Sequence, residues 1–335
     1  MRVSVIIPAY NAASVITSTL DTIGAQTAPP FEVLVVDDGS LDDTAEVARR
    51  HPVVTRVITR ENGGICPARN DAIEQARGDL VFNIDADDLW HPLYIERMSE
   101  MMTGHPEAAS GFSAYSCWLF PAEEPEPFDM EVPAETRFHR AADFVETKTT
   151  GLPILPSFHV IRREALLKIG SRPYVENHRQ GEALYLVGIL AAMAPVVEHV
   201  ASLGRYRMHS DAVTGDEIDA ARKIIPCVED LRSAVRQRSD LEITLENRDH
   251  IDEFVASWTR RCARRLGGNG HLSEGRSLLI RSLLRGDRKA GAMAVASFVP
   301  GLKHRVWCDS WRPASVRRAE GTAAWSAPAD STQSR

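Results

Sequence analysis

A chain of 335 residues, 44% hydrophobic and 25% charged, is long enough to bury one large core and an appendage, so one or two domains are expected. The net charge of −7 argues against a nucleic-acid ligand. Five widely spaced cysteines without a Cys-x-x-Cys pair argue against a disulfide framework and a zinc site. We therefore expect a protein of the reducing cytoplasm.

The N-terminal part alternates short β-branched runs with segments of helical periodicity. Strands are expected over residues 3–9, 31–36, 54–59 and 80–84. Helical spacing recurs over 15–23, a capping box of Ser40 and Asp43 opens a helix to residue 50, and Pro67 starts a helix that Gly78 stops. This alternation predicts an α/β fold with a mostly parallel sheet, helices on both faces, and ligands outside the carboxyl ends of the strands.

The second half is expected to be less regular. Further strands are expected over 108–120, 157–161 and 196–207, and helices over 140–147, 162–169 and 181–193, with an exposed loop over 121–133. From about residue 216 the pattern is helical, broken at 267–270 and at Gly286, so a domain boundary is placed near Gly215. Residues 216–317 form the expected helical region, and the small, polar tail 318–335 is expected to be disordered.

Neither a signal peptide nor a transmembrane helix is expected. The first apolar run is too short and lacks a cleavage site, and the uncharged runs 183–197 and 290–302 fall short of the ~20 apolar residues of a spanning helix. The stretch 276–311 mixes Arg and Lys with Leu, Phe and Trp, which is typical of an interfacial amphipathic segment. Peripheral contact with the inner face of a membrane is one expectation, and a packed helix with a solvated basic face is the alternative.

A cluster of acidic residues follows the fourth expected strand, in the run from Asn83 to Asp88. Crowded carboxylates repel one another unless a cation lies among them, and such hard oxygen ligands suit Mg²⁺ or Mn²⁺, which take further bonds from water and phosphate. The pattern predicts a cation site for a nucleotide diphosphate. A solvated acidic turn ahead of Pro92 is the alternative.

Four motifs in order resemble the family 2 glycosyltransferases of GT-A fold. They are Val3 to Asn11, Val35 to Ser40, Asn62-Gly63-Gly64 with Ala68-Arg69-Asn70, and Asp85 to Asp88. A weaker likeness runs through 161–170 and 206–209, so the resemblance covers about the first 210 residues. It implies a Rossmann-like GT-A domain over 1–215 that binds a nucleotide sugar and carries out catalysis, followed by the helical region.

The resemblance also implies donor-binding residues. The carboxylate of Asp38 would accept the imide N–H of a uracil ring, and Asp37 would orient it or the ribose; helix capping is the alternative for both. Arg69 would approach the ribose or diphosphate, unless it is an ordinary surface group. The donor-binding candidates are Pro8, Tyr10, Asn11, Asp37, Asp38, Arg69, Asp85, Ala86 and Asp87.

The implied cofactor is Mn²⁺ or Mg²⁺, acting as a Lewis acid on the leaving diphosphate. Asp87 is its expected ligand, and Asp85, Asp88 and His209 are further candidates. A loop histidine is often only solvated, which is the alternative for His209.

The general base is where this chain departs from the family. A Glu-Asp pair that opens a helix is usual there, and the corresponding place contains Gly181, Glu182 and Ala183. Either Glu182 matches the family's Glu and Ala183 has replaced the base, or Glu182 is itself the base, one methylene longer. We favour the second, because a Glu at a helix start can project into a cleft. Simple complementation of the helix dipole is the alternative.

Together these features predict an inverting glycosyltransferase for polysaccharide or glycoconjugate synthesis. It would move a sugar from a nucleotide diphosphate donor, a UDP-sugar, to a saccharide or lipid-linked acceptor. A nucleotide-sugar-binding protein that has lost its base is the alternative, suggested by Ala183. A dinucleotide-dependent oxidoreductase is disfavoured because no Gly-x-Gly-x-x-Gly follows the first strand.

Overall fold

The computed structural model describes residues 1–120, 125, 127–140, 155–178, 181–209, 217–298 and 306–307. Within these residues nine strands form one mixed sheet in the order β3-β2-β1-β4-β8-β6-β9-β5, with β7 paired to β9. The strands are β1 (Val3–Ala9), β2 (Glu32–Asp37), β3 (Arg56–Thr59), β4 (Leu80–Asn83), β5 (Leu89–Trp90), β6 (Ser110–Phe120), β7 (Thr136–His139), β8 (His159–Arg162) and β9 (Val196–His209). Most of the expected helix 140–147, Gly215 and the tail 318–335 lie outside the described residues.

The first four strands are parallel. β1 lies between β2 and β4, with Ala9 opposite Asp37 and Ile6 opposite Asn83. All seven residues of β1 are buried, as expected for a parallel strand covered on both faces. β8 then pairs antiparallel with β4 and with β6, which makes the sheet mixed. The predicted α/β fold with a mostly parallel sheet is confirmed.

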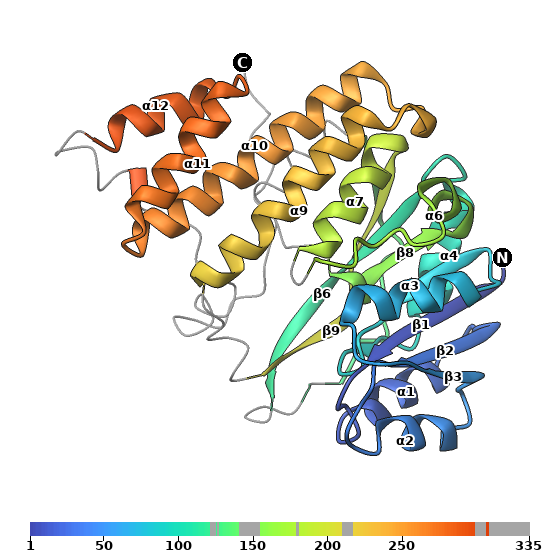
Figure 1. The fold of residues 1–335 in the computed structure, drawn as a ribbon. Helices are drawn as coiled ribbons and strands as arrows, with labels where there is room; N and C mark the ends of the chain where they lie inside the picture. The colour runs from blue at the N-terminus through green and yellow to red at the C-terminus, as the bar shows by residue number, and fades with distance from the viewer. Residues whose placement is uncertain are drawn as a thin grey trace.

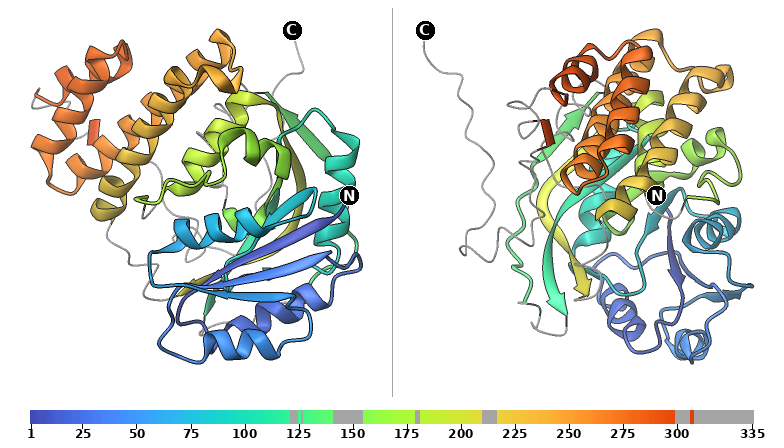
Figure 2. Two further views of the ribbon diagram at one scale, coloured as in Figure 1. Left: turned by 45° about the vertical axis from the view of Figure 1, so that its right-hand side comes forward. Right: turned by 60° about the vertical axis from the view of Figure 1, so that its left-hand side comes forward.

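Helices cover both faces of the sheet, each over its own hydrophobic cluster (Figure 1 and Figure 2). Apolar side chains of α1 (Ile16–Gly24), α2 (Thr44–Arg50) and α4 (Tyr94–Gly104) fill one cluster. The other receives α3 (Ile65–Gln75), α6 (Arg163–Ile169) and α7 (Glu182–Met193). The alternation of side chains along each strand sends neighbours such as Val5 and Ile6 into opposite clusters.

The C-terminal helices extend this second layer and then leave it. Within α9 (Glu217–Gln237) and the first half of α10 (Leu245–Gly268), apolar residues such as Leu231 and Phe254 join the cluster of α7. The second half of α10, α11 (Leu272–Leu284) and α12 (Arg288–Ala296) form a separate cluster with Trp307. The predicted breaks at 267–270 and Gly286 are confirmed. Among the described residues, no helix is long and apolar enough to span a membrane.

Two local predictions were wrong. The capping box does not form, because the hydroxyl of Ser40 accepts the backbone N–H of Asn11 at 2.9 Å and Asp43, the N-cap residue of α2, makes no side-chain cap bond. α3 begins at Ile65, two residues before Pro67, because Gly64 at φ 97° turns the chain into the helix earlier. A long-range contact replaces the local one in the first case.

Candidate active site

Parallel pairing of β1 with β2 and β4 brings three strand ends to one edge of the sheet. Tyr10 and Asn11 follow β1, Asp37 and Asp38 end β2, and the acidic run follows β4. The short η1 (Pro156–Phe158) leads into antiparallel β8 and so reaches the same edge. The predicted donor-binding motifs therefore lie on neighbouring strand ends, where open α/β sheets bind ligands.

Asp38 holds the loop that enters α3. Its two carboxylate oxygens accept the backbone N–H groups of Gly63 at 3.1 Å and Gly64 at 2.7 Å, and the guanidinium of Arg60 forms an ion pair with it. Gly39, at φ 74°, has no room for a side chain, since a Cβ there would lie 2.8 Å from the backbone N of Asn62. The motifs containing Asp38 and Gly63-Gly64 are thus one unit in space.

The turn after β1 joins the turn after β2. The side-chain oxygen of Asn11, at φ 49°, accepts the N–H of Leu41 at 2.8 Å, and Asp37 accepts the N–H of Ser40 at 3.3 Å. Pro8 is buried in β1, whereas Tyr10 is 50% exposed. Tyr10 is consequently the aromatic side chain of this turn that a planar ligand can reach.

Arg69 joins two parts of the site that are far apart in sequence. Its guanidinium donates to Asp85 at 2.6 Å and to Glu182, the first residue of α7, at 2.9 Å. The side chain of Arg69 is fully buried, whereas those of Asp85 and Glu182 are 27% and 14% exposed. Burial disfavours the charge of Arg69, but the two carboxylates outweigh it and raise the pKa of the guanidinium. We call these three side chains the Arg69 bridge.

Neighbouring residues hold the Arg69 bridge in place. The guanidinium lies 5.4 Å from the ring centroid of Tyr174. Asn70 fixes Tyr174 by pairing with its backbone carbonyl at 2.8 Å and its N–H at 3.0 Å. The Nε atom of Arg69 is buried without a hydrogen-bond partner among the described residues. Arg69 thus enters the site from a rigid position and retains one unsatisfied donor.

The acidic turn after β4 is fixed through its backbone. Ser157 Oγ accepts the N–H of Asp85 at 3.0 Å, and Thr19 donates to the carbonyl of Ala86 at 2.9 Å. Arg207, from β9, donates its Nε to the carbonyl of Asp87 at 2.7 Å and its backbone N–H to Asp88 Oδ1 at 2.9 Å. Three separate elements therefore set the direction of these carboxylates.

The turn has the composition of an open cation site. Asp88 is fully buried, its Oδ2 has no partner among the described residues, and burial together with Asp87 and Asp85 raises its pKa well above the usual range. A cation would relieve this crowding of like charge. Among the described residues, no group of three or more His, Cys, Asp or Glu side chains is placed to hold a metal ion. A cation at this turn would therefore need bonds from a bound ligand and water in addition to the carboxylates. The side chain of His209 lies outside the described residues.

Several residues of the site were not identified from the sequence. Arg60, Ser157 and Tyr174 occur in no recognised motif. Arg207 lies in the weaker likeness over 206–209, from which no role for it was predicted. Each acts through a backbone group or a partner at least 22 residues away, which one sequence does not reveal. If Glu182 is not the base, Asp211 and Glu176 are the next candidates from the sequence. Glu176 is paired with Arg172 at 2.7 Å and is absent from the Arg69 bridge.

A family model describes this part of the chain. Residues 4–170 match glycosyl transferase family 2, a range that contains all four motifs except Val3, the first residue of the first motif. The chain belongs to this family. Its relatives include the teichuronic acid biosynthesis glycosyltransferase TuaG of Bacillus subtilis, named as putative, 34% identical over 136 residues that cover 39% of this chain and 52% of TuaG. Chondroitin synthase of Pasteurella multocida is 39% identical over 98 residues, 28% of this chain and 10% of that protein. The match thus spans about half of TuaG and less of the synthase.

Two solved structures share the fold. S. aureus TarS 1-349 in complex with UDP-GlcNAc superposes with a TM-score of 0.64 at 20% identity, over 91% of this chain and 87% of that one. The mannosyltransferase PcManGT of Pyrobaculum calidifontis, in complex with GDP-Man and Mn²⁺, gives 0.58 at 19% identity, over 91% and 83%. At such identities the likeness shows the fold alone, and it extends into the helical region that the family model does not cover.

Proposed function

We propose that this family 2 member is an inverting glycosyltransferase that moves a sugar from a UDP-sugar to a hydroxyl of a saccharide or lipid-linked acceptor. The Arg69 bridge is the observation that carries the proposal. It joins a carboxylate of the acidic turn to the carboxylate at the start of α7, so the two groups that a displacement needs lie on either side of one guanidinium.

The donor side binds the nucleotide diphosphate. In the proposal, Asp38 and Tyr10 meet the base, and Asp37, Pro8 and Asn11 form the turn beneath it. Asp87 would hold Mn²⁺ or Mg²⁺, with Asp85, Asp88 and His209 as further candidate ligands. The cation supplies Lewis-acid stabilisation to the leaving diphosphate. The backbone contacts of Arg207 and Ser157 keep the acidic turn directed at that group before the donor arrives. Such preorganisation lowers the reorganisation needed during transfer.

The acceptor side removes a proton. We assign Glu182 as the general base: its carboxylate, 14% exposed and held at one oxygen by Arg69, accepts the proton of the acceptor hydroxyl as that oxygen attacks the anomeric carbon. Attack from the face opposite the leaving group inverts the configuration. The bond from Arg69 holds the carboxylate of Glu182 in one orientation, which is what a positioned base requires.

The relatives support the class of substrate. The TarS complex contains UDP-GlcNAc and the PcManGT complex contains GDP-Man with Mn²⁺, so nucleotide sugars bind to this fold. We choose UDP because the family resemblance assigns the carboxylate of Asp38 to the imide N–H of uracil. We choose a saccharide polymer as acceptor because TuaG is named for teichuronic acid biosynthesis.

A two-stage experiment tests the proposal. A thermal-shift screen of nucleotide sugars comes first, since a ligand at 100 times its Kd stabilises the fold by about 2.7 kcal/mol. UDP-sugars are expected to raise the Tm more than GDP-sugars. The hit is then incubated with and without Mn²⁺, and release of UDP is measured. Failure of every nucleotide sugar to raise the Tm would contradict the proposal.

A catalytically degenerate nucleotide-sugar-binding protein is the second candidate. It is favoured by Ala183, which has no proton acceptor, and by the ion pair of Glu182 with Arg69, which a purely structural carboxylate would also form. This candidate predicts a thermal shift with UDP-sugars and no release of UDP under any condition. The proposed transferase predicts a thermal shift and also release of UDP.

A further inference from the structure

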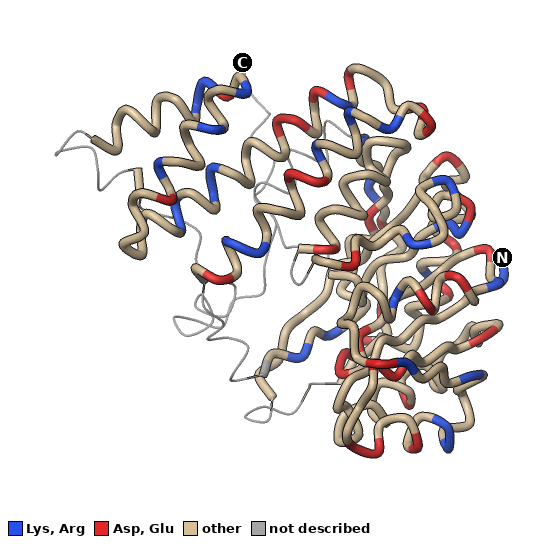
Figure 3. Tube along the Cα trace, viewed as in Figure 1, with Lys and Arg blue, Asp and Glu red and all other residues tan. Residues whose placement is uncertain are grey.

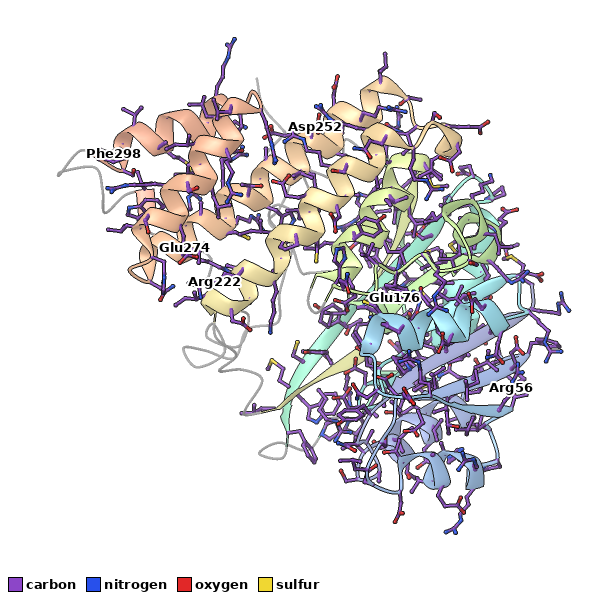
Figure 4. The ribbon with its side chains drawn as sticks, viewed as in Figure 1. Arg56, Glu176, Arg222, Asp252, Glu274 and Phe298 are labelled. Atoms are coloured by element: carbon purple, nitrogen blue, oxygen red, sulfur yellow. The ribbon has the colours of Figure 1, made fainter. Side chains whose placement is uncertain are left out.

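The outer face of the α11–α12 hairpin exposes large apolar side chains. Those of α11 are Ile280, Leu283 and Leu284, with 43%, 41% and 81% of their surface exposed. Val295 of α12 and Phe298 just after it are 69% and 62% exposed. We call these five residues, together with Arg276 and Arg288, the hairpin face. Figure 4 shows Phe298 at the outer end of the helical region, remote from Glu176 beside the sheet.

Contacts between the two helices make the hairpin face continuous. The guanidinium of Arg276 lies 4.0 Å from the ring centroid of Phe298 and donates to the carbonyl of Ser297 at 2.7 Å. Leu283 packs against Gly291, where an added Cβ would lie 2.7 Å from its Cδ1. On α11, residues 276, 280 and 284 share one side at helical spacing, while the opposite side is buried in the C-terminal cluster.

This end of the chain is strongly basic. Between Trp258 and Phe298 the sequence has nine Arg or Lys residues and two Asp or Glu, although the chain as a whole has a net charge of −7. Blue segments accordingly outnumber red ones on these helices in Figure 3. Within this stretch, the described ion pairs leave Arg264, Arg276, Arg281 and Arg288 without a carboxylate partner. The hairpin face is thus an apolar surface with uncompensated positive charge on and beside it.

We propose that the hairpin face docks on the surface of an anionic lipid bilayer. Apolar side chains next to arginines suit the boundary of headgroups and acyl chains, where the long Arg stems lie along the apolar layer and their heads stay hydrated. A second copy of the chain would bring like charge against like charge, which disfavours self-association through this face. Figure 1 shows the hairpin on the side of α10 away from the sheet, so docking there leaves the strand-end site uncovered.

The inference deepens the proposed function, on which it rests for one point: a bilayer is the place where a lipid-linked acceptor is found. Lipid binding itself does not depend on catalysis. A wild type that binds vesicles but transfers no sugar would therefore reject the proposed function and leave the docking intact. A wild type that transfers sugar but does not bind vesicles would reject the docking alone.

Vesicle flotation of the full chain tests the docking. Vesicles of phosphatidylglycerol and phosphatidylcholine in equal parts are compared with pure phosphatidylcholine at low ionic strength. The wild type is expected to float with the anionic vesicles and to be released by high salt, since exposed charges are screened. Each arginine near an anionic surface contributes about fivefold to affinity, so Arg281→Gln with Arg288→Gln is expected to weaken binding roughly 25-fold.

A second variant tests the apolar part, with a matched control. Leu284→Ser, Val295→Ser and Phe298→Ser together are expected to reduce binding at least about tenfold, because three apolar side chains leave the interface. Leu167→Ser with Leu245→Ser changes two leucines that are 52% and 80% exposed elsewhere and should bind as wild type does. Wild type that stays unbound with anionic vesicles would overturn the proposal, and so would wild-type binding by either the double arginine variant or the triple serine variant. So would light scattering that shows a dimer which the triple variant abolishes.

Discussion

The strand-end site and the hairpin face use charge in opposite ways. At the strand ends the charged groups are buried or half-buried, and each is fixed by a partner: Asp38 by Arg60 and two amides, Glu182 by Arg69. On the α11–α12 hairpin, arginines without carboxylate partners flank exposed apolar side chains. Directed, desolvated contacts can orient a reacting group, whereas exposed charge can only attract. We therefore expect the strand-end site to carry out the chemistry and the hairpin face to bring the protein to a membrane surface.

The two regions also differ in what the family shares. The family model ends at residue 170, before α7 and all of the C-terminal helices. The acidic turn and the loop into α3 thus lie within the range that the family model matches, while Glu182 and the hairpin face lie beyond it. Variants in the two regions should therefore have different effects. Those in the strand-end site should change turnover or donor affinity, and those in the hairpin face should change membrane contact.

Removal of Arg69 is expected to have the largest effect, because Arg69 bonds both Asp85 and Glu182. Arg69→Met leaves Asp85 and Glu182 without their buried partner, which should lower the free energy of unfolding by about 3–5 kcal/mol and abolish turnover. Arg172→Met is the control: Arg172 also pairs with several carboxylates but is 37% exposed, so a loss under about 1 kcal/mol is expected. Urea denaturation measures both. Equal losses of unfolding free energy in the two variants would show that the Arg69 bridge stabilises the fold no more than an exposed ion pair does.

Glu182→Gln should lower transfer by about 10²–10⁴-fold while donor binding stays intact, because only the proton acceptor is lost. Glu182→Asp should retain part of the activity. Glu176→Gln, which changes an exposed glutamate paired with Arg172, is the control and should transfer at the wild-type rate. Full activity of Glu182→Gln with a verified acceptor would move the base elsewhere; Asp211, the other candidate, lies outside the described residues.

Asp87→Asn should lower turnover by roughly 10³-fold, equivalent to about 4 kcal/mol of transition-state stabilisation, and abolish the dependence on Mn²⁺ or Mg²⁺. The fold should persist, since Asp87 lies in a turn. Asp79→Asn alters an aspartate at the opposite end of β4, bonded to the N–H of Arg2, and should keep both activity and metal dependence. Steady-state rates over a titration of Mn²⁺ provide the measurement. Unchanged metal dependence in Asp87→Asn would defeat the assignment.

The smallest effect is expected for Asp38→Ala, which should raise the KM for the donor about 10–100-fold with kcat roughly kept. A contact to the base is made equally in the ground and transition states, and a hydrogen bond to a charged group contributes about 1.5–3 kcal/mol. Asp43→Ala, at the N-cap of α2 without a side-chain cap bond, is the control. A large loss of kcat at saturating donor would instead mean that Asp38 acts through the loop it holds.

Particular residues show how much of the site can be predicted from one sequence. The positions of Asp38 and Asp85 at strand ends followed from apolar periodicity and four motifs, and the structure has both strands where they were expected. Arg69 was expected to approach the ribose or diphosphate of the donor. That it pairs with a residue 113 positions later did not follow from its motif. The mixed part of the sheet, with β8 inserted between β4 and β6, had no signal either, since strand order depends on pairing partners and not on local pattern.

The amino-acid sequence by itself determined the class of the protein. Short β-branched apolar runs set which residues form strands, and four ordered motifs set the family, because both depend on neighbours in the chain. The cytoplasmic compartment and the boundary near residue 215 remain predictions of that kind. Tertiary structure alone decided which carboxylates Arg69 joins and that Leu284, Val295 and Phe298 are exposed. The physical reason is that ion pairs and burial are set by groups distant in sequence, whose approach depends on how the whole sheet and its helices pack.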